Sequence, residues 1–211
     1  MNSKNERMTP STMKAVVIDK ITPANAAKLS VIEVPRVKPG WLLVRGGSCA
    51  LGYAAVQIAH SLGCKVAATV RNARHRGLLE RLGCAYVLED DGALSAKGLK
   101  PTKVLELVGT KTLLDSLKTA AQGGVVCHTG ILGGEEPLHA FSPLADIPNG
   151  VHLTGFHSNW PNQKTVDDMF DFIARHGIEP VIAATFPFER IGETLSLQDR
   201  GGFEGKIVVT E

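Results

Sequence analysis

Short apolar runs alternate along most of the chain with segments in which apolar residues recur at the spacing of a helix. Trp41–Arg45 and Lys65–Val70 are nearly continuous in apolar residues, which is typical of strands buried on both faces of a parallel sheet. Between them, apolar residues recur every three or four positions, the spacing of a helix packed on one face, and Gly63 follows as a C-terminal cap. This alternation predicts an α/β fold with a doubly wound, mostly parallel sheet.

The remaining expected elements follow the same pattern. Further strands are expected where apolar runs recur, at Met13–Asp19, Leu29–Pro35, Ala85–Glu89, Lys103–Gly109, Gly124–Gly130, Val151–Phe156 and Lys206–Val209. Further helices are expected around the stripes Leu78–Leu82, Leu113–Ala121 and Val166–Ile173. The acids of the stretch "LEDDG", Leu88–Gly92, are interpreted as a solvated turn.

Composition and charge narrow the class of protein. The chain has 211 residues, a formal net charge of +2, 44% hydrophobic and 21% charged residues, as in an ordinary globular protein. This balance gives no reason to expect nucleic acid or an anionic membrane as a partner, and no apolar run is long enough to span a bilayer. The four cysteines stand apart, without a CxxC pair, which favours a reduced, cytoplasmic protein without a metal cluster.

A glycine-rich turn joins the first buried strand to its helix. It runs Gly46-Gly47-Ser48-Cys49-Ala50-Leu51-Gly52, where small residues let the backbone approach a ligand and the helix begins with free N–H groups. Such a turn favours a phosphate, but Ala50 departs from the regular GxGxxG pattern, so a tight connection that binds nothing stays open. If the turn holds a pyrophosphate, Gly47→Val should abolish binding and leave the sheet folded.

The end of the second strand carries bases where an acid would select NAD. Dinucleotide folds specific for NAD place Asp or Glu there, for the ribose hydroxyls. This chain has "TVRNARHR", Thr69–Arg76, with Arg71, Arg74, His75 and Arg76 able to surround an additional phosphate. A solvated basic helix start is the alternative. The pattern favours NADP(H) over NAD(H).

Seven stretches together resemble the medium-chain dehydrogenases/reductases, on the zinc-free quinone oxidoreductase side. They are "MKAVVIDK", "LLVRGGSCALGYAAVQIAHSLG", "LLERLGCAYVLEDDG", "VLELVGT", "GGVVCHTGILGG", "ADIPNGVHLTGFHS" and "GKIVV". The resemblance implies a Rossmann-type domain of strand order 3-2-1-4-5-6 and a GroES-like catalytic domain built from both chain ends. The expected organisation is a disordered tail at 1–12, remnant catalytic strands at 13–40, an NADP-binding domain at 41–180 and a C-terminal return at 181–211.

The resemblance also implies cofactor contacts, position by position. The turn residues Gly46, Gly47, Ser48, Cys49, Ala50, Leu51 and Gly52 would face the pyrophosphate. Thr69, Arg71, Asn72 and His75 would meet the adenosine ribose and its phosphate, beside Leu107, Val108 and Gly109. Thr129, Gly130, Ile131 and Phe156 would lie along the nicotinamide half.

One departure from the family changes the functional expectation. A long catalytic segment separates "VPRVKPG" from "LLVRGG" in the family, and here the two are fused. No catalytic residue and no metal ligand is assigned. The expected activity is hydride transfer between NADP(H) and an activated carbonyl or alkene of a small-molecule substrate. The alternatives are a truncated, non-catalytic dinucleotide-binding protein, or a fold reused for cofactor-independent chemistry or for binding a partner.

The strand Val151–Phe156 is expected at one edge of the sheet. It contains neither proline nor a charged Lys or Glu, so its free N–H and C=O groups are available for pairing. In the resembling family this strand pairs with its copy across a two-fold axis, which implies a homodimer. The alternative is a monomer whose edge is covered by the loop around Pro143–Gly150.

Overall fold

The computed structural model describes residues 12–20, 28–35, 40–134, 136–157 and 161–211. The chain forms two compact units, Met1–Lys38 and Pro39–Glu211. In the first, β1 (Thr12–Lys20) and β2 (Lys28–Pro35) pair antiparallel. The expected tail lies outside the described residues, except for Thr12, which begins β1.

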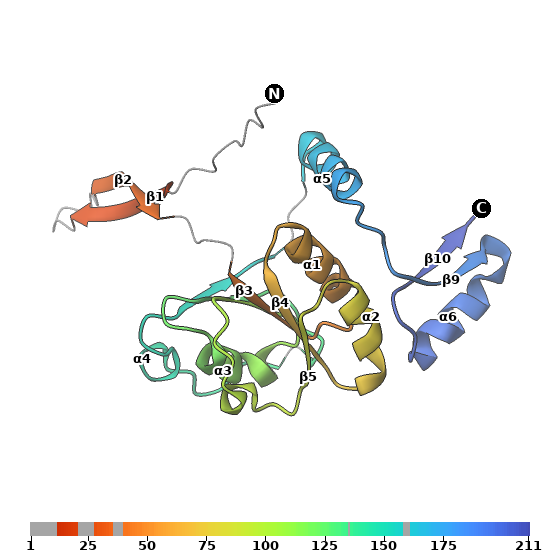
Figure 1. The fold of residues 1–211 in the computed structure, drawn as a ribbon, viewed down its shortest axis with the longest axis horizontal. Helices are drawn as coiled ribbons and strands as arrows, with labels where there is room; N and C mark the ends of the chain where they lie inside the picture. The colour runs from red at the N-terminus through yellow and green to blue at the C-terminus, as the bar shows by residue number, and fades with distance from the viewer. Residues whose placement is uncertain (1–11, 21–27, 36–39, 135, 158–160) are drawn as a thin grey trace, which may run out of the picture. The chain divides into compact units, whose positions relative to one another are not determined.

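The second unit is built around a parallel sheet of six strands in its described residues (Figure 1). Their order across the sheet is β5-β4-β3-β6-β7-β8, and every neighbouring pair is parallel. The strands are β3 (Trp41–Arg45), β4 (Lys65–Val70), β5 (Tyr86–Glu89), β6 (Lys103–Glu106), β7 (Val125–His128) and β8 (His152–Gly155). Counted from β3, this is the order 3-2-1-4-5-6, so the predicted Rossmann-type fold is confirmed.

Helices cover both faces of this sheet. Figure 1 shows α1 and α2 on one side and α3 on the other. These three helices are α1 (Ala50–Ser61), α2 (Arg76–Arg81) and α3 (Thr110–Thr119). Later in the chain, α4 (Pro143–Asp146) and α5 (Gln163–His176) bury no residue. α1 and α3 follow β3 and β6, the two strands between which the chain reverses its direction of winding.

Alternating side chains of the strands supply two cores. In β3, Val44 packs with Tyr53 and Val56 of α1 on one face, whereas Leu43 packs with Leu117 of α3 on the other. These five side chains are at most 1% exposed. Since full burial of a side chain of this size contributes about 1.5–3 kcal/mol, the two cores fix the sheet and the helices that begin at its carboxyl edge.

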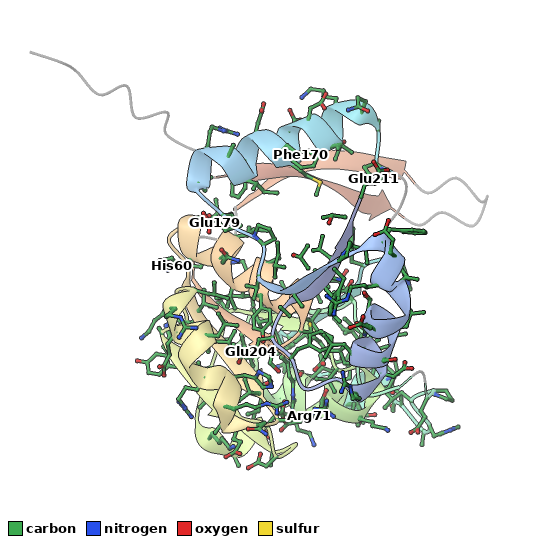
Figure 2. All side chains as sticks on the ribbon, turned by 90° about the vertical axis from the view of Figure 1, so that its right-hand side faces the viewer. His60, Arg71, Phe170, Glu179, Glu204 and Glu211 are labelled. Carbon is green, nitrogen blue, oxygen red and sulfur yellow. The ribbon has the colours of Figure 1, made fainter. Side chains whose placement is uncertain are left out.

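The C-terminal segment is a second strand–helix–strand unit, which sequence analysis did not predict apart from its last strand. β9 (Ile182–Pro187) and β10 (Lys206–Thr210) pair parallel, with α6 (Ile191–Arg200) between them in sequence. Gln57 of α1 donates from Nε2 to the carbonyl of Glu179, which is labelled in Figure 2 (3.0 Å). No helix of the described residues is long and apolar enough to cross a membrane.

Candidate functional site

A cleft of about 450 Å³ opens at the carboxyl edge of the sheet. It lies at the ends of the neighbouring strands β3 and β6, between which the order of the strands reverses, the point at which open α/β sheets bind their ligands. Six residues expected to contact a dinucleotide line it, namely Gly46, Ser48, Cys49, Thr69, Arg71 and Val108. Asp90, Lys111 and Thr112 line it as well and were not expected there.

The glycine turn is held against the end of β4. The N–H of Gly46 donates to Thr69 Oγ1 and the N–H of Gly47 donates to the Thr69 carbonyl, each at 2.9 Å. A Cβ on Gly47 would lie 2.7 Å from the Cβ of Ala68, and one on Gly52 would lie 2.4 Å from the Gly47 carbonyl oxygen. Gly47 and Gly52 are therefore required by the packing of turn, strand and helix. The expectation that Gly47→Val leaves the sheet folded is wrong, because β4 leaves no room for the side chain.

Helix α1 begins at the cleft with a weak cap and no acid. Its N-cap is Cys49, whose Sγ accepts from the N–H of Gly52 at 3.3 Å, and its first turn contains no acidic residue. The first N–H groups of a helix have no acceptor within the helix, and its dipole favours an anion at this end. Because Ser48 and Cys49 line the cleft, this helix end is suited to a phosphate.

Helix α3 also begins at the cleft, but its N-terminus already holds a carboxylate. Oε1 of the buried Glu106 accepts from the N–H of Val108 (2.8 Å), the N–H of Gly109 (3.1 Å) and the hydroxyl of Thr112 (3.0 Å). The hydroxyl of Ser116 donates to Oε2 of the same carboxylate. This end is therefore already occupied by negative charge.

A buried arginine joins the strand ends beneath the cleft. Arg45, the last residue of β3, is 0% exposed and pairs through Nε and Nη2 with the two oxygens of Asp90 (2.9 and 2.8 Å). Its Nη1 donates to Asp115 Oδ2 (2.8 Å), to Ser116 Oγ and to the Thr112 carbonyl. The interpretation of the acids after β5 as a solvated turn is wrong for Asp90, whose side chain is 8% exposed and fully engaged. The cause is Arg45, since a buried guanidinium requires a counter-charge.

This pairing fixes the charge of both groups. Burial alone would raise the pKa of Asp90, but the hydrogen bond and the charge of Arg45, with donors from Gly92 and Thr69, hold it below its ordinary value. Burial alone would lower the pKa of Arg45, but its hydrogen bond and ion pair with Asp90 outweigh this and raise it. Both groups are therefore charged at neutral pH, and Arg45 shares its positive charge between Asp90 and Asp115.

Arg71 and Lys111 are the cations that line the cleft. Arg71 follows β4 directly, is exposed (labelled in Figure 2) and has no hydrogen bond or ion pair with any residue that the structure describes. Nζ of Lys111 lies 3.6 Å from Oε1 of Glu136. Because both side chains are exposed, this ion pair contributes little to stability. Arg71 is thus placed to meet a phosphate with its full set of donors.

The residues that directly follow Arg71 lie outside the cleft lining. Asn72 caps a short 3-10 turn (Ala73–His75), accepting from the N–H of Arg74. His75 is 8% exposed, and its two ring nitrogens contact Arg74 Nε (3.1 Å) and Glu204 Oε1 (2.9 Å). Glu204, labelled in Figure 2, precedes β10. The structure therefore places Arg71 at the cleft and the other basic residues of this run outside its lining.

The remaining expected contacts are spread over three locations. Ala50 and Leu51 line a separate, mostly apolar cavity beside α5. Leu107 is 1% exposed in the core under the turn, and Gly109 is the N-cap of α3. At the ends of β7 and β8, the hydroxyl of Thr129 donates to the carbonyl of Phe156 (2.7 Å). Nearby in sequence, Gly130 packs against the backbone of Leu107, and the side chains of Ile131 and Phe156 are more than half exposed.

The order of the strands and the cleft at their carboxyl ends together define a Rossmann-type domain. The model of the zinc-binding dehydrogenase family matches residues 50–175, more than half of the sequence, and the chain belongs to this family, within the medium-chain dehydrogenases/reductases. In the described part of the chain, no three His, Cys, Asp or Glu side chains are placed to hold a metal ion. Those residues therefore offer no ligand set for the zinc in the family's description.

Curated relatives are enzymes of redox chemistry. An alcohol dehydrogenase of Geobacillus stearothermophilus is 23% identical over 212 residues, which cover 95% of this chain and 59% of that protein. An acryloyl-coenzyme A reductase of Sulfurisphaera tokodaii is 26% identical over 171 residues, covering 80% of this chain and 50% of that protein. The chain thus spans about half to three-fifths of the length of these relatives.

Solved structures share the fold. Bacillus subtilis yhfP with NAD bound matches with a TM-score of 0.68 at 22% identity, covering 83% of this chain and 56% of that one. Mycobacterial Rv1454c complexed with NADPH matches with a TM-score of 0.65 at 21% identity, covering 81% and 57%. Relatives of this fold therefore include proteins solved with either nicotinamide cofactor.

Proposed function

We propose that this chain binds NADP(H) in the cleft at the start of α1 and acts as an oxidoreductase of the quinone reductase or enoyl reductase type. The observation that carries the proposal is the pairing of an open helix end, next to Ser48 and Cys49, with an unengaged Arg71 in one cleft. The first suits the pyrophosphate, and the second suits a phosphate on the adenosine ribose.

Each part of the cleft has a distinct task in this proposal. The N-terminus of α1 binds the pyrophosphate, Arg71 binds the 2′-phosphate, and Val108 lines the wall beside them. Thr129, by bonding the Phe156 carbonyl, ties the ends of β7 and β8 together on the side expected to face the nicotinamide. The bound cofactor supplies the hydride, and the protein supplies its orientation.

The names of the relatives support this reaction class. Acryloyl-coenzyme A reductase and the mycobacterial quinone oxidoreductase act on activated alkenes and quinones by name, and the NADPH complex belongs to the same group of neighbours. The neighbour solved with NAD is the reason that cofactor choice requires a direct test.

Titration with NADPH and NADH, followed by turnover with quinones, enones and enoyl thioesters, tests the proposal. Binding of NADPH with turnover is the expected result. Binding without turnover favours the second candidate, a non-catalytic dinucleotide-binding protein, which the fusion of "VPRVKPG" to "LLVRGG" motivates. Absence of binding contradicts both.

Arg71→Ala tests the selection of NADP(H). Loss of one charge-assisted contact should weaken NADPH by about 1.5–3 kcal/mol and leave NADH almost unchanged. Arg76→Ala is the matched control, since Arg76 is exposed and lies outside the cleft lining, with its Nη1 3.8 Å from Glu80 Oε1. Equal losses for the two cofactors in Arg71→Ala would contradict the assignment of the 2′-phosphate to this residue.

A homodimer through β8 is the proposed assembly. β8 is an edge strand, and the N–H groups of His152 and Phe156 donate inward, to the carbonyls of Gly124 and His128. By alternation, the N–H of Gly155 faces away from the sheet, free to pair with a copy. Light scattering behind a sizing column should give a dimer mass for the parent and a monomer mass for Gly155→Pro. A monomeric parent at micromolar concentration would contradict the dimer.

A further inference from the structure

An acidic side chain lines the cleft, and both of its carboxylate oxygens already accept hydrogen bonds from within the protein. Asp90 is the acidic residue among the described residues of the cleft lining. Its Oδ2 accepts from Arg45 Nε (2.9 Å) and Thr69 Oγ1 (3.0 Å), and its Oδ1 accepts from Arg45 Nη2 (2.8 Å) and the N–H of Gly92 (3.0 Å). A carboxylate with four donors has little capacity left for the hydroxyls of a ribose.

Asp90 is also a neighbour of the residues assigned to the adenosine end. It follows β5, beside the end of β4, where Thr69 bonds it and Arg71 begins the next loop. Thr69 in turn accepts from the N–H of Gly46, so the ion pair, the threonine and the phosphate turn form one connected set. A change in the charge compensation of Asp90 would therefore act on a ligand bound in this cleft.

We infer that Arg45 is a specificity-determining residue for the phosphorylated cofactor, acting through Asp90. The inference rests on the proposed function. With Arg45 in place, the carboxylate of Asp90 is ion-paired and its oxygens are saturated, so its charge opposes a 2′-phosphate at Arg71 less than a free carboxylate would. Without Arg45, an ionised carboxylate would face the cleft, repel the phosphate and accept hydrogen bonds from an unmodified ribose.

The second partner of Arg45 supplies a matched control. Asp115 accepts from Arg45 Nη1 at 2.8 Å, as closely as Asp90 does, but Asp115 does not line the cleft. Removing Arg45 deprives both carboxylates of the guanidinium. Asp115 keeps its donors from Leu94 and Ser95. Asp90 keeps its donors from Thr69 and Gly92, and of the two carboxylates it alone lines the cleft. A purely structural role of Arg45 predicts the same outcome when either is neutralised, whereas the specificity role predicts recovery through Asp90.

The experiment compares Kd for NADPH and NADH, by calorimetry, in four proteins. They are the parent, Arg45→Met, Arg45→Met with Asp90→Asn, and Arg45→Met with Asp115→Asn. Arg45→Met should reduce the preference for NADPH by about tenfold or more, because an uncompensated charge lies beside the phosphate. Asp90→Asn in that background should restore most of the preference, and Asp115→Asn should not.

Two outcomes overturn the inference while the proposed function stands. One is an unchanged ratio of the two Kd values in Arg45→Met, and the other is equal recovery with Asp90→Asn and Asp115→Asn. If Arg45→Met does not fold, the same series is built on Arg45→Gln, which removes the positive charge and keeps an amide donor for the buried carboxylates. A parent that binds neither cofactor contradicts the proposed function, and this inference with it.

Discussion

Helices α1 and α3 begin at the same edge of the sheet, and their N-termini are satisfied in different ways. The first turn of α1 has a thiol as its cap and no acid, whereas the start of α3 holds the carboxylate of Glu106 with three donors on one oxygen. Both helices pack on the sheet through buried apolar residues, so the difference is local to their ends.

The difference shows which helix end is available to a ligand. A helix N-terminus binds one anion well, and Glu106 supplies that anion for α3 from within the protein. α1 lacks an internal anion, and its end lines the cleft beside Arg71. We therefore propose the phosphate site at the start of α1, whereas the start of α3 is satisfied within the protein by Glu106.

Removing the carboxylate at the start of α3 should have the largest effect, a loss of stability. Glu106→Leu removes the acceptor for the N–H groups of Val108 and of the buried Gly109 and for two hydroxyls, so the free energy of unfolding should fall by about 3 kcal/mol. Chemical unfolding followed by circular dichroism measures it. Glu89→Leu, the same change at an exposed position, should stay within about 0.5 kcal/mol of the parent. Equal losses in the two variants would remove the distinction between the helix ends.

Adding a carboxylate at the start of α1 should have an intermediate effect, on the affinity for NADPH. Cys49→Asp places a carboxylate at the N-cap, which makes α1 resemble α3 and should stabilise the free protein by about 0.5 kcal/mol. The same carboxylate should weaken NADPH by about tenfold, roughly 1.4 kcal/mol, through repulsion of the pyrophosphate. Cys49→Ser, an uncharged cap, should bind like the parent. NADPH affinity in Cys49→Asp that matches Cys49→Ser would place the phosphate elsewhere.

Low pH should destabilise the protein through Asp115 of α3, by less than the two substitutions above. The pKa of Asp115, on α3, is lowered: burial would raise it, but hydrogen bonds from Ser95 and the charge of Arg45 outweigh burial. A lowered folded-state pKa means that the stabilisation is present above the ordinary value of 3.8 and is lost as the pH falls further, because the unfolded chain binds the proton first.

Melting curves of the free protein as a function of pH measure this loss. Asp115→Asn should reduce the acid dependence. Asp91→Asn is the control, because Asp91 is exposed and lies outside the Arg45 cluster, although its own pKa is lowered by Lys97 and the N–H of Ala93. An acid dependence that is identical in the parent and in Asp115→Asn would contradict the role of the buried carboxylate.

The elements that form the sheet could be predicted because each has a local signal. Trp41–Arg45 and Lys65–Val70 match β3 and β4 at both ends, since apolar runs there stop at glycine or polar residues. The β9–α6 crossover was missed because α6 buries one residue, Thr194, and its exposed Ile191 and Leu195 do not form a long stripe.

The chemistry of the site was harder to predict than its position. The turn, Thr69 and Arg71 follow from where a dinucleotide fold places its ligand, and the cleft brings them together. The Arg45–Asp90 pair joins residues 45 positions apart, and its existence depends on which strands end side by side. The burial of His75 likewise depends on Glu204, which lies 129 positions away. Local sequence patterns carry no information on such contacts.

A crystal structure of the protein grown with NADP⁺ tests the central claim most directly. The account predicts the pyrophosphate against the backbone N–H groups at the start of α1, with the 2′-phosphate on Arg71 and the Arg45–Asp90 pair intact beneath it. A pyrophosphate bound at the start of α3, with the carboxylate of Glu106 displaced, would contradict the account.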